Sequence, residues 1–161
     1  MSDDLAVLEG GGALRVRLRR ARASDVPALV RLMSDDVISA GRESADLAPY
    51  ERAFARIDAE PAQLLVVGEV DGDPVCTLQL TVIPGLARGG ALRGQVEAVR
   101  VRSDLRSRGI GEALLRWAAD ELRSRGCTVA QLTTDKRRTD AHRFYARLGW
   151  VNSHEGFKLS L

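Results

Sequence analysis

The segment from residue 95 to residue 133 constrains the fold most, because it predicts a strand, a glycine turn, a helix and a second strand in succession. Apolar side chains recur on one face of residues 110–125, which is the pattern of an amphipathic helix. Strand patterns precede this helix at residues 95–101 and follow it at residues 127–133. Two strands joined through such a helix fit a parallel, right-handed crossover in one sheet. We therefore expect a helix packed on a sheet that has at least one parallel strand pair.

The other segments add strands and helices that define the fold class. Residues 13–20 alternate apolar residues with arginines, which predicts a half-buried strand whose arginines face solvent. Ser24 is a preferred helix N-cap, and Asp71-Gly72 between two apolar runs favours a hairpin turn. We therefore expect an α+β domain with a mixed sheet. Further helices are expected at residues 24–33, 48–59 and 139–148, and further strands at residues 63–70, 75–83 and 150–161.

The length of 161 residues fits one domain, which we place at residues 13–161. Residues 1–12 end in three consecutive glycines and are expected to be a flexible lead-in. This acidic start lacks the basic-then-apolar order of a secretory signal. No apolar run approaches the roughly 20 residues that span a bilayer. We therefore expect a cytoplasmic protein that has no membrane partner.

The charge balance bears on the partners of the protein. The chain has 24 Lys and Arg against 22 Asp and Glu, a net charge of +2, whereas dedicated nucleic-acid binders are strongly basic. We expect no nucleic-acid partner. Cys76 and Cys127 lie in apolar runs and are expected to be buried, reduced thiols. His142 and His154 lack the spacing of metal ligands, so we expect no metal.

The turn at residues 106–111, Arg-Ser-Arg-Gly-Ile-Gly, carries the strongest functional signal. It leads into a helix, whose N-terminus presents unpaired N–H groups and a partial positive charge. Gly109 and Gly111 let the backbone approach an anion closely, and Arg106 and Arg108 add charge. This combination predicts a phosphate or pyrophosphate site, with a tight turn carrying exposed arginines as the alternative. A P-loop is excluded because no Lys-Ser or Lys-Thr follows Gly111.

Two blocks of the sequence resemble the GCN5-related N-acetyltransferase (GNAT) family. Residues 106–111 match its hallmark Gln/Arg-x-x-Gly-x-Gly/Ala, which follows the family's fourth strand. Residues 141–150 match a second pattern of the family, Ala-x-x-Phe-Tyr-x-x-x-Gly-aromatic. The resemblance covers roughly residues 16–161. It implies a GNAT-type fold, a central twisted and mostly antiparallel sheet with a parallel crossover between the family's fourth and fifth strands, flanked by about four helices.

The resemblance implies that acetyl-CoA is the cosubstrate. In the family arrangement, the backbone of Val99 and Val101 would pair with the pantetheine arm like an added strand. Arg106 would assist the backbone amides that hold the pyrophosphate. Arg138 stands where many relatives have a cofactor-contacting asparagine, so its surroundings either meet the CoA phosphates or form a solvated loop. The amides assigned to the pyrophosphate are those of Arg108, Gly109, Ile110 and Gly111.

Acetyl transfer to an amine requires a base, stabilisation of the oxyanion and a proton donor for the leaving thiolate. Glu97 is the base candidate, because packing alone hardly justifies a carboxylate in an otherwise apolar strand. Strand alternation would place Glu97, Val99 and Val101 on one face. Anchoring the substrate ammonium and a structural role are the alternatives for Glu97. Tyr145 matches the family tyrosine whose hydroxyl points at the CoA sulfur, and its alternative is a core aromatic beside Phe144.

These features together predict an acetyl-CoA-dependent N-acetyltransferase that works by direct attack within a ternary complex. A small amine or amino-acid-like metabolite is the favoured acceptor. A protein or peptide amine and a non-catalytic CoA-binding sensor module are the alternatives. The loop at residues 84–93, with Leu86 and Arg88 as candidate contacts, is expected to cover the acceptor or to meet a second subunit. Family precedent suggests a homodimer.

Overall fold

A computed structural model describes residues 3–35 and 40–161 of the chain. The chain divides into two compact units, Met1–Gln131 and Leu132–Leu161. The described strands all lie in the first unit, and α5 (Thr139–Arg147) is the described helix of the second. The strands are β1 (Asp4–Glu9), β2 (Arg15–Arg20), β3 (Gln63–Val70), β4 (Asp73–Ile83), β5 (Leu92–Val101) and β6 (Cys127–Gln131). The helices of the first unit are α1 (Val26–Ser34), α2 (Ala48–Ala59), α3 (Ala87–Gly90) and α4 (Ile110–Ser124).

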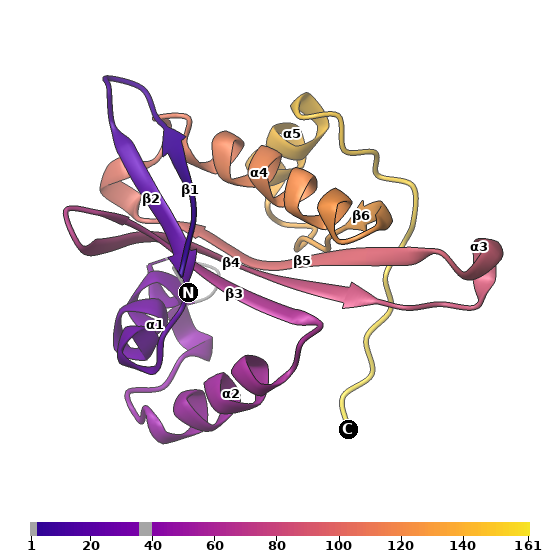
Figure 1. The fold of residues 1–161 in the computed structure, drawn as a ribbon, viewed down its shortest axis with the longest axis horizontal. Helices are drawn as coiled ribbons and strands as arrows, with labels where there is room; N and C mark the ends of the chain where they lie inside the picture. The colour runs from indigo at the N-terminus through magenta and orange to yellow at the C-terminus, as the bar shows by residue number, and fades with distance from the viewer. Residues whose placement is uncertain (1–2, 36–39) are drawn as a thin grey trace. The chain divides into compact units, whose positions relative to one another are not determined.

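The strands of the first unit form one sheet in the order β1-β2-β3-β4-β5-β6 (Figure 1). Neighbouring strands from β1 to β5 are antiparallel, whereas β6 pairs with β5 in parallel. The helix α4 connects β5 to β6, which confirms the crossover expected from the sequence. The expected mixed fold class is confirmed as well.

Helices cover both faces of this sheet. Successive residues of each strand point to opposite faces, so each strand contributes side chains to both. On β3, Leu65 and Val67 face α1 and α2, and Phe54 of α2 joins the same buried cluster. The other face carries α4 (Figure 1). There, α4 approaches β5 so closely that a Cβ on Gly94 would lie 2.4 Å from Leu122. The layers are therefore helix, sheet and helix.

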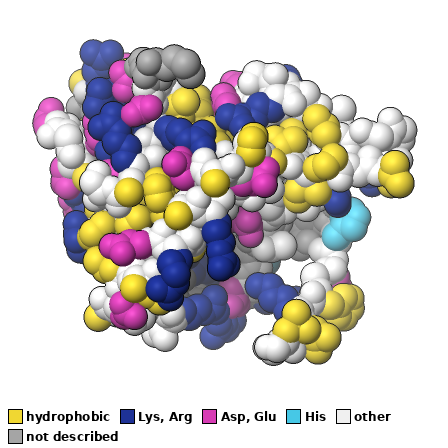
Figure 2. Space-filling view, turned by 60° about the horizontal axis from the view of Figure 1, so that its bottom comes forward, with side chains coloured by type: hydrophobic (Ala, Val, Ile, Leu, Met, Phe, Trp, Pro, Cys, Tyr) yellow, Lys and Arg dark blue, Asp and Glu magenta, His cyan; other side chains and the backbone are white. Residues whose placement is uncertain are grey.

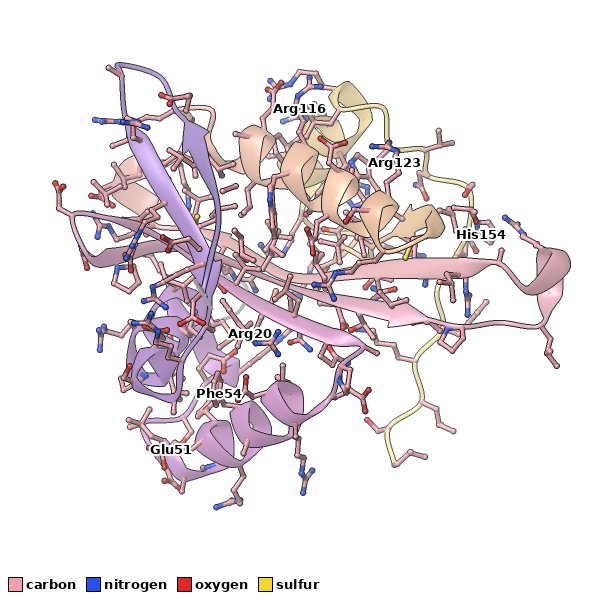
Figure 3. All side chains as sticks on the ribbon, in the orientation of Figure 1. Arg20, Glu51, Phe54, Arg116, Arg123 and His154 are labelled. Carbon is pink, nitrogen blue, oxygen red and sulfur yellow. The ribbon has the colours of Figure 1, made fainter. Side chains whose placement is uncertain are left out.

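The surface of α4 confirms the amphipathic pattern of its sequence. Leu114 and Leu122 are almost completely buried. Arg116 and Arg123 lie on the outer side of the helix, away from the sheet (Figure 3). On the face shown in Figure 2, basic and acidic side chains both occur, in keeping with the small net charge. None of the helices in residues 3–35 and 40–161 is long and apolar enough to cross a membrane.

The turn between β3 and β4 is the one predicted from the sequence. Pairing of the two strands extends to Val70 and Asp73, so the connection consists of Asp71 and Gly72. Both have a positive φ, 50° for Asp71 and 83° for Gly72. Positive φ at both central residues is the signature of the hairpin turn that Asp-Gly favours.

The N-terminal residues are more ordered than the sequence suggests. Residues 1–12 were expected to be a flexible lead-in, yet Asp4–Glu9 forms β1. This strand pairs with β2, for example at Leu8 opposite Val16. Leu8 is 7% exposed, so β1 contributes to the core. The expectation was wrong because pairing with β2 orders this segment, and the short apolar run Leu-Ala-Val-Leu does not by itself specify that pairing.

The arginine face of β2 is only partly solvated, which corrects a second expectation. Arg19 is 6% exposed and donates from Nη1 to Asp25 Oδ2 (2.7 Å) and from Nε to Glu69 Oε2 (2.8 Å). Asp25 also accepts the N–H of Arg22 (2.7 Å) at the entry to the first helix. The N-cap residue of α1 is Asp25 and not Ser24 as expected.

The second unit lacks the closing strands expected at residues 150–161. None of residues 148–161 belongs to a helix or a strand. Phe157, Leu159 and Leu161 alternate as in a half-buried strand, but all three are at least 85% exposed. An alternating pattern specifies a strand only when a partner edge is available. The sequence pattern was therefore an insufficient guide here.

Candidate functional site

The turn that precedes α4 has the backbone conformation of an anion site. Ser107 and Gly109 have positive φ values of 62° and 78°. Gly109 is the N-cap of α4, and a Cβ built on it would meet no atom within 4 Å. The first N–H groups of a helix lack partners within the helix. The turn thus offers free space beside a positive helix end, which fits a phosphate or pyrophosphate.

Arg106, predicted to assist at the pyrophosphate, stabilises the turn by donating to two backbone carbonyl oxygens. Its Nε donates to Val101 O (3.0 Å), and its Nη2 donates to Asp35 O at the end of α1. The carboxylate of Asp35 accepts the N–H of Ser103 at 2.7 Å. The turn is therefore tied to both β5 and α1. Contact between Arg106 and the cosubstrate stays a prediction.

A β-bulge in β5 corrects the predicted alternation around Glu97. Gln79 of β4 pairs with Glu97, but Thr77, two residues away, pairs with Arg100, three residues away on β5. The additional residue coincides with Ala98, whose φ is 51°. Residues that pair across two strands lie on the same face of the sheet, and Thr77 and Gln79 share a face of β4. Glu97 therefore shares a face with Arg100.

The bulge separates Glu97 from Val101. Val101 pairs with Cys76, which lies on the opposite face of β4 from Thr77 and Gln79. The expectation that Glu97, Val99 and Val101 share one face was therefore wrong. Bulges are common beside active sites, where they redirect side chains and interrupt pairing. Glu97 itself is exposed, whereas Val96 beside it is 2% exposed.

Polar side chains that sequence reasoning did not single out surround Glu97 on its face of the sheet. Gln63 Oε1 accepts from Gln79 Nε2 (2.9 Å) and from Thr81 Oγ1 (2.8 Å). Gln131 Nε2 donates to Gln95 Oε1 (2.8 Å). The pairing of Gln63 with Thr81, of Thr81 with Gln95 and of Gln95 with Gln131 places these four side chains in one row across β3 to β6. The signal was present as polar residues two apart in strands that are otherwise apolar.

The second unit holds the other predicted site residues. The ring of Tyr145 contacts those of Phe144 (centroids 5.5 Å apart) and Trp150 (6.3 Å). Tyr145 is thus part of an aromatic cluster, and its role as proton donor stays a prediction. Arg138 is the N-cap residue of α5, and its N–H donates to Asp135 O at 2.9 Å. Its contact with CoA also stays a prediction.

The two cysteines are free and buried, as expected. Burial raises the pKa of the Cys76 thiol to about 12. Burial likewise raises the pKa of Cys127 above its ordinary value. A thiol whose pKa is raised by an apolar environment is a poor nucleophile. Neither cysteine therefore fits a covalent acetyl-transfer step.

A protein-family model described as Acetyltransferase (GNAT) family matches residues 28–150. The chain belongs to the GNAT acetyltransferase family. The family and the fold expected from the sequence are thus confirmed. Among curated proteins, aminoalkylphosphonate N-acetyltransferase from Salmonella typhimurium is 40% identical over 68 residues. That match spans 42% of this GNAT chain and only 44% of the relative's length.

Solved structures resemble the GNAT chain over most of its length. A protein from Bacillus halodurans C-125, described as a transcriptional regulator, is 39% identical with a TM-score of 0.87. The match covers 91% of this chain and 99% of that one. A putative acetyltransferase from Agrobacterium tumefaciens is 27% identical with a TM-score of 0.80, covering 89% and 99% of the two chains.

Proposed function

We propose that the protein is an acetyl-CoA-dependent N-acetyltransferase that acetylates the primary amine of a small metabolite. The observation that carries the proposal is that β5 connects two features of the site. Its bulge carries the exposed carboxylate of Glu97, and the turn after it leads to the N-terminus of α4. The carboxylate suits the ammonium of the acceptor. The helix N-terminus suits the pyrophosphate of the donor.

Acetyl-CoA supplies an activated thioester, and the residues of the chain handle the protons. A primary ammonium has a pKa of about 10.4, so the acceptor arrives protonated near pH 7. Glu97 takes that proton, directly or through water, and the amine then attacks the thioester carbon within the ternary complex. Tyr145 is the proposed donor of a proton to the departing thiolate. Attack by the amine forms the C–N bond and expulsion of the thiolate breaks the C–S bond. The proton that the attached nitrogen then loses replaces the one that Tyr145 gives to the thiolate.

The favoured acceptor class is a small amine that also bears an anion, such as an aminoalkylphosphonate. Two observations support it. The Salmonella relative takes its name from that substrate class. In addition, the bulge places the guanidinium-bearing Arg100 on the same face as Glu97, three residues away along β5. A carboxylate and a guanidinium on one face suit an acceptor with an ammonium and an anion.

Two alternatives to this function differ in what they predict. A protein or peptide amine as acceptor predicts turnover of lysine peptides in preference to small amines. A CoA-binding sensor without catalysis is favoured by the description of the Bacillus halodurans protein as a transcriptional regulator. It predicts binding of acetyl-CoA without turnover.

Three further expectations stay predictions. They are a single domain at residues 13–161, a cytoplasmic location and a homodimer.

The test is thiol release from acetyl-CoA with matched acceptors, namely 2-aminoethylphosphonate, ethylamine and a short lysine peptide. We expect release with 2-aminoethylphosphonate and at least tenfold lower kcat/KM with ethylamine, because only the former carries an anion. Preference for the peptide would reject the metabolite. Binding of acetyl-CoA by calorimetry, without release from any broad amine pool, would favour the sensor.

A further inference from the structure

The turn between β1 and β2 contacts the turn that precedes α4, although about 100 residues separate them in the sequence. The N–H of Gly11 donates to the carbonyl oxygen of Arg108 at 2.7 Å. Within the first turn, the N–H of Gly10 donates to Leu14 O, also at 2.7 Å. A backbone group of the N-terminal hairpin thus holds a backbone group in the middle of the candidate anion site.

The contact is close enough to explain why Gly10 is a glycine. A Cβ on Gly10 would lie 3.2 Å from the carbonyl oxygen of Arg108, which is tighter than an ordinary contact. A Cβ on Gly11 would lie 3.5 Å from the same oxygen, an ordinary van der Waals distance. Glycines allow such close approach of two backbones. Gly10 therefore lets the turn between β1 and β2 approach the carbonyl oxygen of Arg108.

The held carbonyl fixes the direction of the amide that follows it. In a trans peptide, the C=O of one residue and the N–H of the next point in opposite directions. Holding the carbonyl of Arg108 toward Gly11 therefore directs the N–H of Gly109 away from the hairpin. Gly109 has a φ of 78° and no side chain, so nothing in its own structure prevents its preceding peptide from rotating.

We propose that the β1–β2 hairpin is a positioning element for the donor's pyrophosphate. It locks the Arg108–Gly109 peptide so that the Gly109 N–H faces the anion before the cosubstrate binds. This inference rests on the proposed function, since it assumes that the turn binds acetyl-CoA. Preorganisation of this kind improves affinity, because no ordering cost remains to be met on binding.

The hairpin is firmly mounted, as a positioning element must be. Leu8 of β1 is 7% exposed and pairs with Val16, which is completely buried. Glu9, at the end of β1, pairs with Arg15 at the start of β2. β1 also packs against α4, the helix whose N-terminus forms the site. The pairing of β1 with β2 and the packing of β1 on α4 therefore fix the position of the Gly11 N–H relative to α4.

The test compares Gly11→Pro, which removes the N–H donor, with Gly11→Ala, which keeps it and fits the available space. We expect Gly11→Pro to raise the Kd for CoA, measured by calorimetry, about tenfold, the effect of losing one directed hydrogen bond. Gly11→Ala should have an affinity for CoA within about twofold of that of the wild type. Gly10→Val, whose side chain would press on the Arg108 carbonyl, should act like Gly11→Pro and serves if the proline variant does not fold.

A second donor separates positioning from general damage. Acetylpantetheine lacks the pyrophosphate, so KM for this donor should be the same in Gly11→Pro and wild type, while KM for acetyl-CoA rises and kcat is kept. An equal rise in KM for both donors would overturn this inference but not the proposed function. Wild-type affinity for CoA in both Gly11→Pro and Gly10→Val would do the same. Failure of the wild type to bind CoA would overturn the proposed function and this inference with it.

Discussion

At the scale of single residues, the exposure of Glu97 depends on the bulge in β5. The bulge requires Ala98 to adopt a φ of 51°, a conformation that alanine rarely takes. Backbone strain of this sort costs of order 1–3 kcal/mol and clusters at functional sites. The placement of Glu97 thus depends on tertiary structure.

If Glu97 is the base, Glu97→Gln should lower kcat by roughly two orders of magnitude, since general base catalysis contributes 10²–10⁴-fold. The loss should be greatest below pH 8, where removal of the ammonium proton limits the rate. The measurement is the pH profile of kcat with saturating acetyl-CoA. An ammonium anchor predicts instead a raised acceptor KM with the profile kept. Glu51→Gln, at an exposed site on α2 (Figure 3), is the matched control and should behave as wild type.

At the scale of elements, the regular segments were predictable and the irregular ones were not. Helix α2 begins at Ala48 and ends at Ala59, and β3 runs from Gln63 to Val70, all as expected from periodicity. Local patterns suffice there, because each element buries one face on its neighbours. The bulge in β5, the strand β1 and the row of glutamines depend on pairing with distant segments. No window of the sequence contains that information.

The anion site belongs to the element scale, because it depends on the turn and α4 together. Gly109→Glu should weaken CoA binding at least 100-fold, since it adds strain at a φ of 78° and a negative charge beside the pyrophosphate. Gly109→Gln has the same size and strain without the charge, so its loss should be clearly smaller. Calorimetry with CoA measures both. Equal losses would show that strain alone matters, and unchanged affinity would remove the phosphate assignment.

At the scale of the whole first unit, a buried ion network joins strands β2 and β3 to the entry of α1. Arg19 contacts both Asp25 and Glu69, and each of the three residues is at most 7% exposed. Arg17 adds a further bond to Glu69 from the surface. The sequence shows four arginines within β2 but could not tell which one is buried, because the acidic partners come from other segments.

We expect this network to make the stability of the protein depend on pH. Burial by itself would raise the pKa of Glu69 and of Asp25, but hydrogen bonds and charges from the arginines outweigh it. The net pKa of each carboxyl is lowered. A lowered pKa contributes stability that is present above the unfolded-state pKa, about 4, and is lost as the pH falls through the folded-state pKa. The free energy of unfolding should therefore fall steeply below pH 4.

Glu69→Gln tests this prediction, because glutamine keeps the shape and removes the charge. At pH 7 the free energy of unfolding should drop by about 3 kcal/mol, since Arg19 stays buried with one ionic partner fewer. Below pH 4 its acid dependence should be weaker than that of the wild type. Urea unfolding at pH 3 and pH 7 measures both effects. Asp120→Asn, in the exposed pair with Arg123, should change neither, because exposed ion pairs contribute little. A Glu69→Gln protein as stable as the wild type at pH 7 would mean that the buried Arg19–Glu69 ion pair does not stabilise the pairing of β2 with β3.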